Sequence, residues 1–171
     1  QAEGLSRLNQ RLARAVRQAL PGDRPAAILE VGGGTGSTTS HLLELLPRES
    51  YHYLFTDVGR HLVAEAQTRF AEFPVECRYL NLENSLIEQG LVAGQFDVVV
   101  AANVLHATVD LASTLEKVRA VLKPGGFLFL LETTRPQAWV TVVSGMTEGW
   151  WSYQDTGLRK DSPLLSVDKW L

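Results

Sequence analysis

The sequence predicts an α/β fold, a doubly wound and mostly parallel sheet with helices on both faces. Strand-like and helix-like segments alternate five times along the chain. The strand-like segments are apolar throughout, as strands are when helices cover both faces of a parallel sheet. A glycine-rich turn follows the first strand and opens a helix. Right-handed crossovers then place the ligand site of such a sheet at the carboxyl ends of its strands.

The totals agree with a single intracellular domain. The chain has 171 residues, 45% hydrophobic and 20% charged, which is enough to bury a sizeable core. No run is apolar enough for a membrane span, and a net charge of −3 argues against a nucleic-acid binder. The single cysteine, Cys77, forms no internal disulfide and is expected in the core. The N-terminal stretch does not have the pattern of a secretory signal, and together these two features predict a cytoplasmic protein. Four scattered histidines give no metal-ligand spacing, so no metal site is expected.

The first predicted helix lies within residues 1–24. Apolar residues recur at helical spacing from Leu5 to Leu20, and four arginines form an opposing stripe. We interpret this stripe as a solvated helix face; the alternative is a docking surface for an acidic partner. Pro21 and Gly22 end the helix.

The alternating segments follow in order up to Glu132. Strands are predicted at 26–31, 51–57, 75–82, 96–104 and 127–132. Helices are predicted at 37–46, 61–73 and 111–122, with a short helical patch at 86–91. The helix at 111–122 is expected to close at Pro124, Gly125 and Gly126. Beyond Glu132 the sequence is aromatic and turn-rich, without a plain period.

The glycine turn and a following carboxylate predict an adenosine-containing cofactor. "LEVGGGTG" ends the first strand, and its glycines let the backbone approach a ligand beside unpaired helix N–H groups. Asp57 ends the second strand, 25 residues after Gly32. A carboxylate there can accept hydrogen bonds from both ribose hydroxyls. The alternative is a merely structural turn.

The glycine spacing distinguishes two such cofactors, NAD and S-adenosylmethionine. A dinucleotide fingerprint reads G-x-G-x-x-G. Here Gly32, Gly34 and Gly36 give G-x-G-x-G, and Ser37 stands where the third glycine of the fingerprint belongs. The pattern therefore disfavours a pyrophosphate ligand, and an NAD-dependent oxidoreductase is the weaker hypothesis.

Several blocks together resemble the methyltransferase domains of modular type I polyketide synthases, which are class I, Rossmann-like, S-adenosylmethionine-dependent methyltransferases. These blocks are "ILEVGGGTGSTT", "FTD", "FDVVVAANVLHAT", "LKPGG", "LLE" and "EGWW…LR…PLLS…W". "NVLHAT" and "EGWW" are the more specific ones. The resemblance runs from about Ile28 to the C-terminus.

The resemblance implies roles for seven residues at the cofactor. Glu30, Gly32 and Gly34 would line the methionine part of the cofactor, and Asp57 would hold the ribose. Asn81 and Leu82 would flank the adenine, and Asn103 would lie near the amino group. The sequence departs from the family pattern at Gly33, Ser37 and Asn81, where alanine, glycine and aspartate are more usual, and in "DVGRH". These departures raise the alternative of an inactive pseudo-methyltransferase with a structural role.

His106 and Glu132 are the candidate catalytic pair. His106 follows the fourth strand and Glu132 closes the fifth, and in a class I sheet these strands are neighbours about 5 Å apart. A carboxylate bonded to one ring nitrogen orients an imidazole and raises its basicity, leaving the other nitrogen to take a proton. Similar polyketide carbon-methyltransferases use a His–Glu pair at these motif positions.

The expected reaction follows from the resemblance and this pair. The domain would methylate the α-carbon of a β-ketoacyl chain on an acyl carrier protein, beside the other domains of a polyketide synthase. Oxygen methylation by the same pair is the alternative within the enzyme class. Three interpretations stay open for Trp150 and Trp151: they wall the acyl pocket, belong to a lid, or form a packed aromatic pair.

The expected organisation is one methyltransferase domain over 1–171. Residues 1–24 form the N-terminal helix, 26–132 the cofactor-binding core, and 133–171 a substrate-side or lid segment. Class I methyltransferases continue into a hairpin after the fifth strand, and the chain stops where that hairpin would follow. We therefore expect a truncated sheet whose exposed edge favours poor solubility or self-association.

Overall fold

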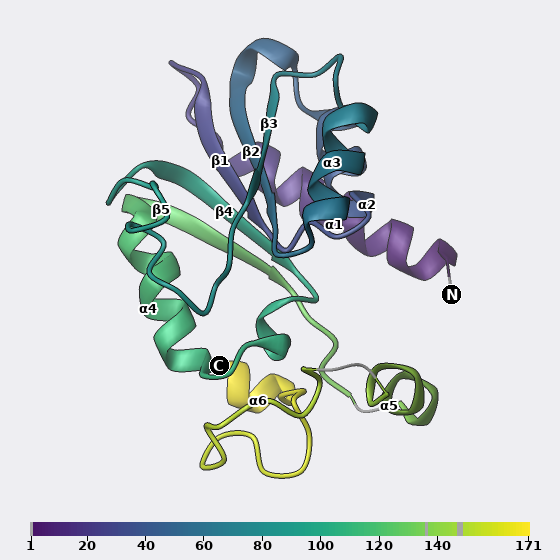
Figure 1. The fold of residues 1–171 in the computed structure, drawn as a ribbon. Helices are drawn as coiled ribbons and strands as arrows, with labels where there is room; N and C mark the ends of the chain where they lie inside the picture. The colour runs from purple at the N-terminus through teal and green to yellow at the C-terminus, as the bar shows by residue number, and fades with distance from the viewer. Residues whose placement is uncertain (1, 136, 147–148) are drawn as a thin grey trace.

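The computed structural model describes residues 2–135, 137–146 and 149–171. Its centre is a parallel sheet in the order β3-β2-β1-β4-β5 (Figure 1). The strands are β1 (Ala26–Val31), β2 (Tyr51–Asp57), β3 (Val75–Tyr79), β4 (Phe96–Ala102) and β5 (Leu122–Leu131). The strand order changes direction between β1 and β4, which is where a doubly wound sheet opens a crevice. The predicted fold class is confirmed.

Helices cover both faces of the sheet (Figure 1). The helical elements are α1 (Ala2–Ala19), α2 (Ser37–Leu45), η1 (Arg48–Ser50), α3 (Arg60–Arg69), η2 (Leu105–Ala107), α4 (Leu111–Val121), α5 (Ala138–Ser144) and α6 (Val167–Trp170). Helices α1, α2 and α3 lie on one face and α4 lies on the other. Within the described ranges, no helix combines the length and the apolar character needed to cross a bilayer.

Two apolar layers hold these helices to the sheet. Ile28 and Val98 face the layer under α1, α2 and α3, while their neighbours Leu29 and Val99 face the layer under α4. All four are 0% exposed, so the strands are buried on both sides, as their continuous apolar sequences predict. Cys77 of β3 packs, partly buried, against the first layer.

Helix α1 lies along the first layer. Leu12, Ala13 and Val16 are buried in it. The four arginines of the opposing stripe are exposed, which agrees with their interpretation as a solvated face; they are Arg7, Arg11, Arg14 and Arg17. The predicted N-terminal helix thus forms, and it packs by its leucine and valine side.

The predicted helical patch at 86–91 is wrong, because the chain makes a series of turns there. Gly90 has a φ of 91°, a left-handed conformation that ends any helical run. The Gln89 side chain pairs with both backbone groups of Asn81, at 2.8 Å each. Leu86 and Leu91 are nevertheless buried, so the apolar pattern reports burial rather than a helix.

Strand β5 begins earlier than the sequence indicates. Helix α4 ends at Val121, and β5 starts at Leu122, which pairs with Phe96. The register then shifts, so that Phe127 pairs with Val98. The inserted residues bulge around Gly125, whose φ is 78°. The proline and glycines therefore shape a bulge instead of closing the helix.

Beyond Leu131 the described part of the chain contains no strand. Strand β5 is accordingly an edge of the described sheet, and Phe127 and Leu130 on it are exposed. Helices α5 and α6, with the loops around them, lie beyond the carboxyl ends of the strands (Figure 1).

Candidate active site

The glycine turn lies at the carboxyl end of β1, where the sheet changes direction. Gly32, Gly34 and Gly36 have φ values of 62°, 56° and 75°, which disfavour any residue with a side chain. A Cβ at Gly32 would overlap the Val104 side chain, which follows β4. The glycines therefore permit both the left-handed backbone and its close approach to the neighbouring strand end.

Asp57 points from the end of β2 into this turn. Its Oδ2 accepts the Gly34 N–H at 2.9 Å and its Oδ1 accepts the Gly59 N–H at 2.7 Å. The carboxylate is buried, with the residue 6% exposed. Each carboxylate oxygen can accept more than one hydrogen bond, so both can still receive a hydroxyl donor from a ligand.

A cavity of about 500 Å³ opens between the glycine turn and the end of β4. Six of the seven residues predicted at the cofactor line it: Gly32, Gly34, Asp57, Asn81, Leu82 and Asn103. The other lining residues are Val58, Leu80, Glu83, Val104, Ala107 and Thr108. The volume is within the range of small-molecule and cofactor sites. Left-handed glycines, a carboxylate with accepting capacity and an apolar wall suit an adenosine-containing ligand.

Glu30 does not line this cavity. Its side chain lies beneath the turn, where Oε2 accepts hydrogen bonds from the Thr39 hydroxyl at 2.6 Å and the Tyr53 hydroxyl at 2.7 Å. Burial raises the pKa of Glu30 to about 7, and the nearby charge of Asp57 adds to this effect. Its Oε1 has no hydrogen-bond partner among the described residues. The structure thus places Glu30 under the cofactor cavity instead of on its surface.

His106 and Glu132 meet above the ends of β4 and β5. Glu132 Oε2 lies 2.6 Å from His106 Nδ1, and the two side chains are only 4% and 11% exposed. Glu132 Oε1 accepts two backbone N–H groups, from Val104 at 3.0 Å and from Leu105 at 2.8 Å. Because a carboxylate only accepts hydrogen bonds, Nδ1 carries the proton, and Nε2 is left with a lone pair. The pair has the geometry of an oriented base.

A second cavity, of about 510 Å³, holds this histidine. Its residues come from α1, the end of β4, α5 and the chain beyond: Leu5, Leu8, Asn103, His106, Thr133, Gln137, Val140, Ser144, Trp150 and Leu164. Five of these ten side chains are apolar and come from three parts of the chain, so the cavity suits a ligand with an aliphatic body and a polar end. Only Asn103 lines both this cavity and the first one.

Asn103 marks the place where the two cavities meet, because it lines both of them. Its φ of 53° is left-handed, the single such case outside glycine among the described residues. Its N–H donates to the Leu131 carbonyl at 2.6 Å, and its Oδ1 accepts from both the backbone and the hydroxyl of Thr133 at 3.0 Å. These bonds from β5 hold a strained backbone in place.

The two adjacent tryptophans differ in position. Trp150 is 7% exposed and meets the His106 ring edge-on, with the ring centroids 5.5 Å apart. Trp151 is 53% exposed and donates its Nε1–H to the Gly145 carbonyl. Trp150 therefore walls the second cavity, while Trp151 does not line it.

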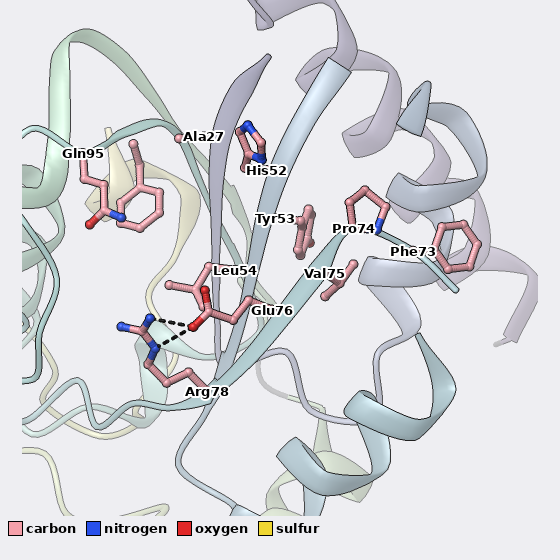
Figure 2. A pocket seen from close by; sticks show the side chains of 11 residues that line it. Ala27, His52, Tyr53, Leu54, Phe73, Pro74, Val75, Glu76, Arg78 and Gln95 are labelled. Carbon is pink, nitrogen blue, oxygen red and sulfur yellow. Dashed lines mark hydrogen bonds and ion pairs between the residues drawn. The ribbon is translucent and has the colours of Figure 1, made fainter. Parts of the chain in front are cut away.

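A third hollow lies at the opposite end of the strands, away from the two cavities. Figure 2 shows this space of about 570 Å³ at the amino-terminal starts of the strands, where Ala27, His52 and Val75 lie. None of the predicted site residues lines it. Among the described residues no group of three His, Cys, Asp or Glu side chains is arranged to hold a metal ion.

Arg159 is a site residue that the sequence reading missed. Its buried guanidinium donates to the backbone carbonyl of His106 at 3.0 Å. Arg159 is part of the "LR" in the family-like block "EGWW…LR…PLLS…W", but that block alone does not indicate this contact. Thr133, which bonds Asn103, was also missed, because it stands in no motif except by adjacency to Glu132.

Comparison with known proteins supplies the family context. Residues 29–128 match the sequence family described as "Methyltransferase domain". A hybrid PKS-NRPS synthetase, lepA, of Aspergillus flavus is 38% identical over 165 residues, which cover 95% of this chain and 4% of that protein. The methyltransferase calH of Penicillium decumbens is 40% identical over 149 residues, covering 84% of this chain and 40% of that protein.

Solved structures give the same picture. The CurJ carbon methyltransferase superposes with a TM-score of 0.91 at 39% identity, over 95% of this chain and 44% of that chain. The carbon-methyltransferase (CMeT) domain of the citrinin polyketide synthase superposes with a TM-score of 0.79 at 34% identity, over 85% of this chain and 38% of that domain. The chain thus spans less than half of these solved relatives and a few per cent of the synthases.

Proposed function

Because the chain belongs to the methyltransferase-domain family and its methyl donor is S-adenosylmethionine, we propose that it methylates the α-carbon of a β-ketoacyl chain held on an acyl carrier protein. The observation that carries the proposal is the His106–Glu132 pair: His106 lines the second cavity, and Asn103 lines both this cavity and the first. The similarity to solved carbon methyltransferases of polyketide synthesis supports it.

The residues of the first cavity suit the donor. Asp57 offers acceptor capacity for the ribose hydroxyls, the left-handed glycines bring backbone N–H groups close, and Asn81 and Leu82 border the adenine end. When bound, S-adenosylmethionine supplies an electrophilic methyl group on a sulfonium. Everything else in the reaction falls to side chains of this protein and to the acceptor.

His106 acts as the base. The carbon between a ketone and a thioester is acidic because both carbonyls share the negative charge of the enolate. Nε2 of His106 removes that proton, and the Glu132 carboxylate, 2.6 Å from Nδ1, stabilises the imidazolium that forms. The buried position of both side chains keeps competing water away from the pair. No side-chain nucleophile is required.

The second cavity holds the acceptor. Val140, Trp150 and Leu164 give it apolar walls for an acyl chain, and its position beyond the strand ends supports a substrate-side role for the segment 133–171. The carrier protein and the other domains of a polyketide synthase are the proposed partners, in the cytoplasm. The relatives that are whole synthases support this context.

The experiment offers the protein S-adenosylmethionine and a carrier-bound β-ketoacyl chain, then locates the added methyl by mass spectrometry and NMR. We expect α-carbon methylation that falls at least about 100-fold in His106→Ala. His52→Ala is the matched control, because His52 lies at the opposite end of the strands (Figure 2).

Three outcomes would contradict the proposal. A methyl found on oxygen would make the protein an O-methyltransferase. Absence of S-adenosylmethionine binding in calorimetry would make it a pseudo-methyltransferase with a structural role. Full activity in His106→Ala would remove the base from the mechanism.

A further inference from the structure

Arg159 is the largest fully buried side chain among the described residues, with 0% of the side chain exposed. Its guanidinium donates to three backbone carbonyls that follow one another closely along the chain. Nη1 donates to His106 at 3.0 Å, and Nη2 donates to Thr108 at 2.8 Å and to Val109 at 3.1 Å. Removing a guanidinium from water costs free energy, which its hydrogen bonds must offset. A fully buried arginine with three carbonyl acceptors therefore indicates a specific role.

The His106 carbonyl lies within η2, the single 3-10 turn that carries this histidine; Thr108 caps the turn and Val109 follows it. The last carbonyls of a helical turn have no partner within the turn, and they carry the negative end of its dipole. The first N–H groups of the same turn, at Val104 and Leu105, are bonded to the Glu132 carboxylate. An anion thus holds the start of the turn and the Arg159 cation holds its end, each complementing the local dipole.

Asp155 fixes the guanidinium from its other side. Its Oδ1 accepts from Arg159 Nε at 2.5 Å, and its Oδ2 accepts from the Leu111 N–H, in the first turn of α4, at 3.2 Å. The Tyr153 ring lies 5.1 Å from the guanidinium carbon. The 149–171 segment therefore contacts the stretch between β4 and α4 through the Arg159–Asp155 ion pair, and also through the Gln154 N–H, which donates to the Val109 carbonyl at 2.8 Å.

Three different contacts hold His106. Glu132, at the end of β5, holds the ring at Nδ1, Trp150 packs edge-on against the ring, and Arg159 holds the backbone carbonyl. Without the last of these contacts the backbone at residue 106 can shift, and the ring can no longer keep its bond to Glu132 and its direction into the cavity together. A displacement of about 1 Å near reacting groups can cost about 100-fold in rate.

We propose that Arg159 is a positioning residue for the base: by holding the carbonyl end of η2, it keeps the His106 imidazole on Glu132 with Nε2 directed at the acceptor. This inference rests on the proposed function in taking His106 as the base. Arg159 lines neither the cofactor cavity nor the cavity of His106, so its effect reaches the reaction only through the turn.

The test compares Arg159→Lys with Arg159→Met in the full chain. Lysine keeps a cation beside Asp155 but lacks the planar fork that reaches three carbonyls. We expect kcat for methyl transfer to fall about 10- to 100-fold in both variants, while the Kd for S-adenosylmethionine stays within about twofold. Arg119→Lys, on the exposed side of α4, is the matched control and keeps wild-type kcat.

A second readout needs no acceptor. In ¹⁵N NMR, wild-type His106 should show one tautomer, protonated at Nδ1, and Arg159→Lys should show a mixture as the bond to Glu132 loosens. This measurement separates the two proposals. If no acceptor is methylated but the tautomer still depends on Arg159, the proposed function fails and the positioning role stands.

Two results would overturn the positioning role. One is kcat in Arg159→Lys within about twofold of wild type, with the His106 signals unchanged. The other is loss of S-adenosylmethionine binding and of the cooperative melting transition in both variants. That result would mean that Arg159 is required for the fold of the whole domain.

Discussion

Glu132 bonds three donors of one short turn: Oε2 takes the ring Nδ1 of His106 at 2.6 Å, and Oε1 takes two consecutive backbone N–H groups. The same carboxylate therefore holds both the ring and the turn that carries it. A change at Glu132 affects both the tautomer of His106 and the position of its backbone.

Glu132→Gln should reverse the tautomer. If the amide oxygen keeps the two backbone N–H groups, the amide nitrogen donates to Nδ1, which then becomes an acceptor and moves the ring proton to Nε2. We expect kcat to fall about 100-fold or more, with unchanged S-adenosylmethionine affinity, and His106 to change tautomer in ¹⁵N NMR. Glu116→Gln, exposed on α4, is the control. Activity close to wild type would show that the carboxylate is not the orienter.

Asp57→Asn should weaken cofactor binding. Both Asp57 oxygens accept backbone N–H groups, so an amide nitrogen must face one of those donors, and one acceptor for the ribose is lost. Calorimetry should show Kd for S-adenosylmethionine rising about 10-fold or more. Asp23→Asn, exposed before β1, should leave it unchanged. An equal change in both variants would point to net charge rather than to this site.

Gly33→Ala should destabilise the protein, although alanine is usual in the family it resembles. The ring of Phe55, itself fully buried, occupies the space that a Cβ at residue 33 would need. Urea unfolding should show a loss of about 1–3 kcal/mol. In Gly33→Ala/Phe55→Leu the losses should be less than additive. Gly157→Ala, with open space around it, should cost little, and simple additivity in the double variant would contradict this coupling.

Glu30→Gln should change the pH dependence of stability. The pKa of Glu30 rises on folding from 4.5 to about 7, so between these values the folded protein holds a proton that the unfolded chain releases. The unfolding free energy of the wild type therefore falls as pH rises through this window, by up to about 3 kcal/mol. Glutamine carries no proton to lose, so the variant should gain most over wild type at pH 8. Urea unfolding at both ends of the window tests this.

The control for Glu30→Gln is Glu44→Gln, exposed on α2, whose effect should not depend on pH. The same stability difference between Glu30→Gln and wild type at pH 4 and at pH 8 would show that Glu30 ionises normally in the folded protein.

The sheet and most of the first cavity could be predicted for two reasons. Each strand is visible as a short apolar run, and a parallel sheet brings the carboxyl ends of its strands together. Five apolar runs define the strands, and the residues after them, such as Asp57, Asn103 and His106, must gather at one edge. Glu30 shows the limit of that reasoning. It lies one residue before the end of β1, but alternation turns its side chain toward Tyr53, below the turn.

The segment after Glu132 could not be predicted because side-chain contacts to distant backbone, not periodicity, determine its position. Arg159 bonds carbonyls about fifty residues earlier in the chain, and no spacing rule links the two. The prediction for residues 86–91 was wrong for a related reason: the Gln89 side chain bonds the backbone of Asn81, and Gly90, with a φ of 91°, ends the run of turns.

The position of Asn103, where the two cavities meet, has a consequence for the order of events in turnover. The two cavities have only this lining residue in common. On the proposed assignment, with the donor in the first cavity and the acyl chain in the second, the spent donor and the acyl chain would leave by separate routes, and neither would have to wait for the other to depart. Initial-rate kinetics with both ligands varied should then follow a random sequence, and a megasynthase could reload its donor while the growing chain stays in place.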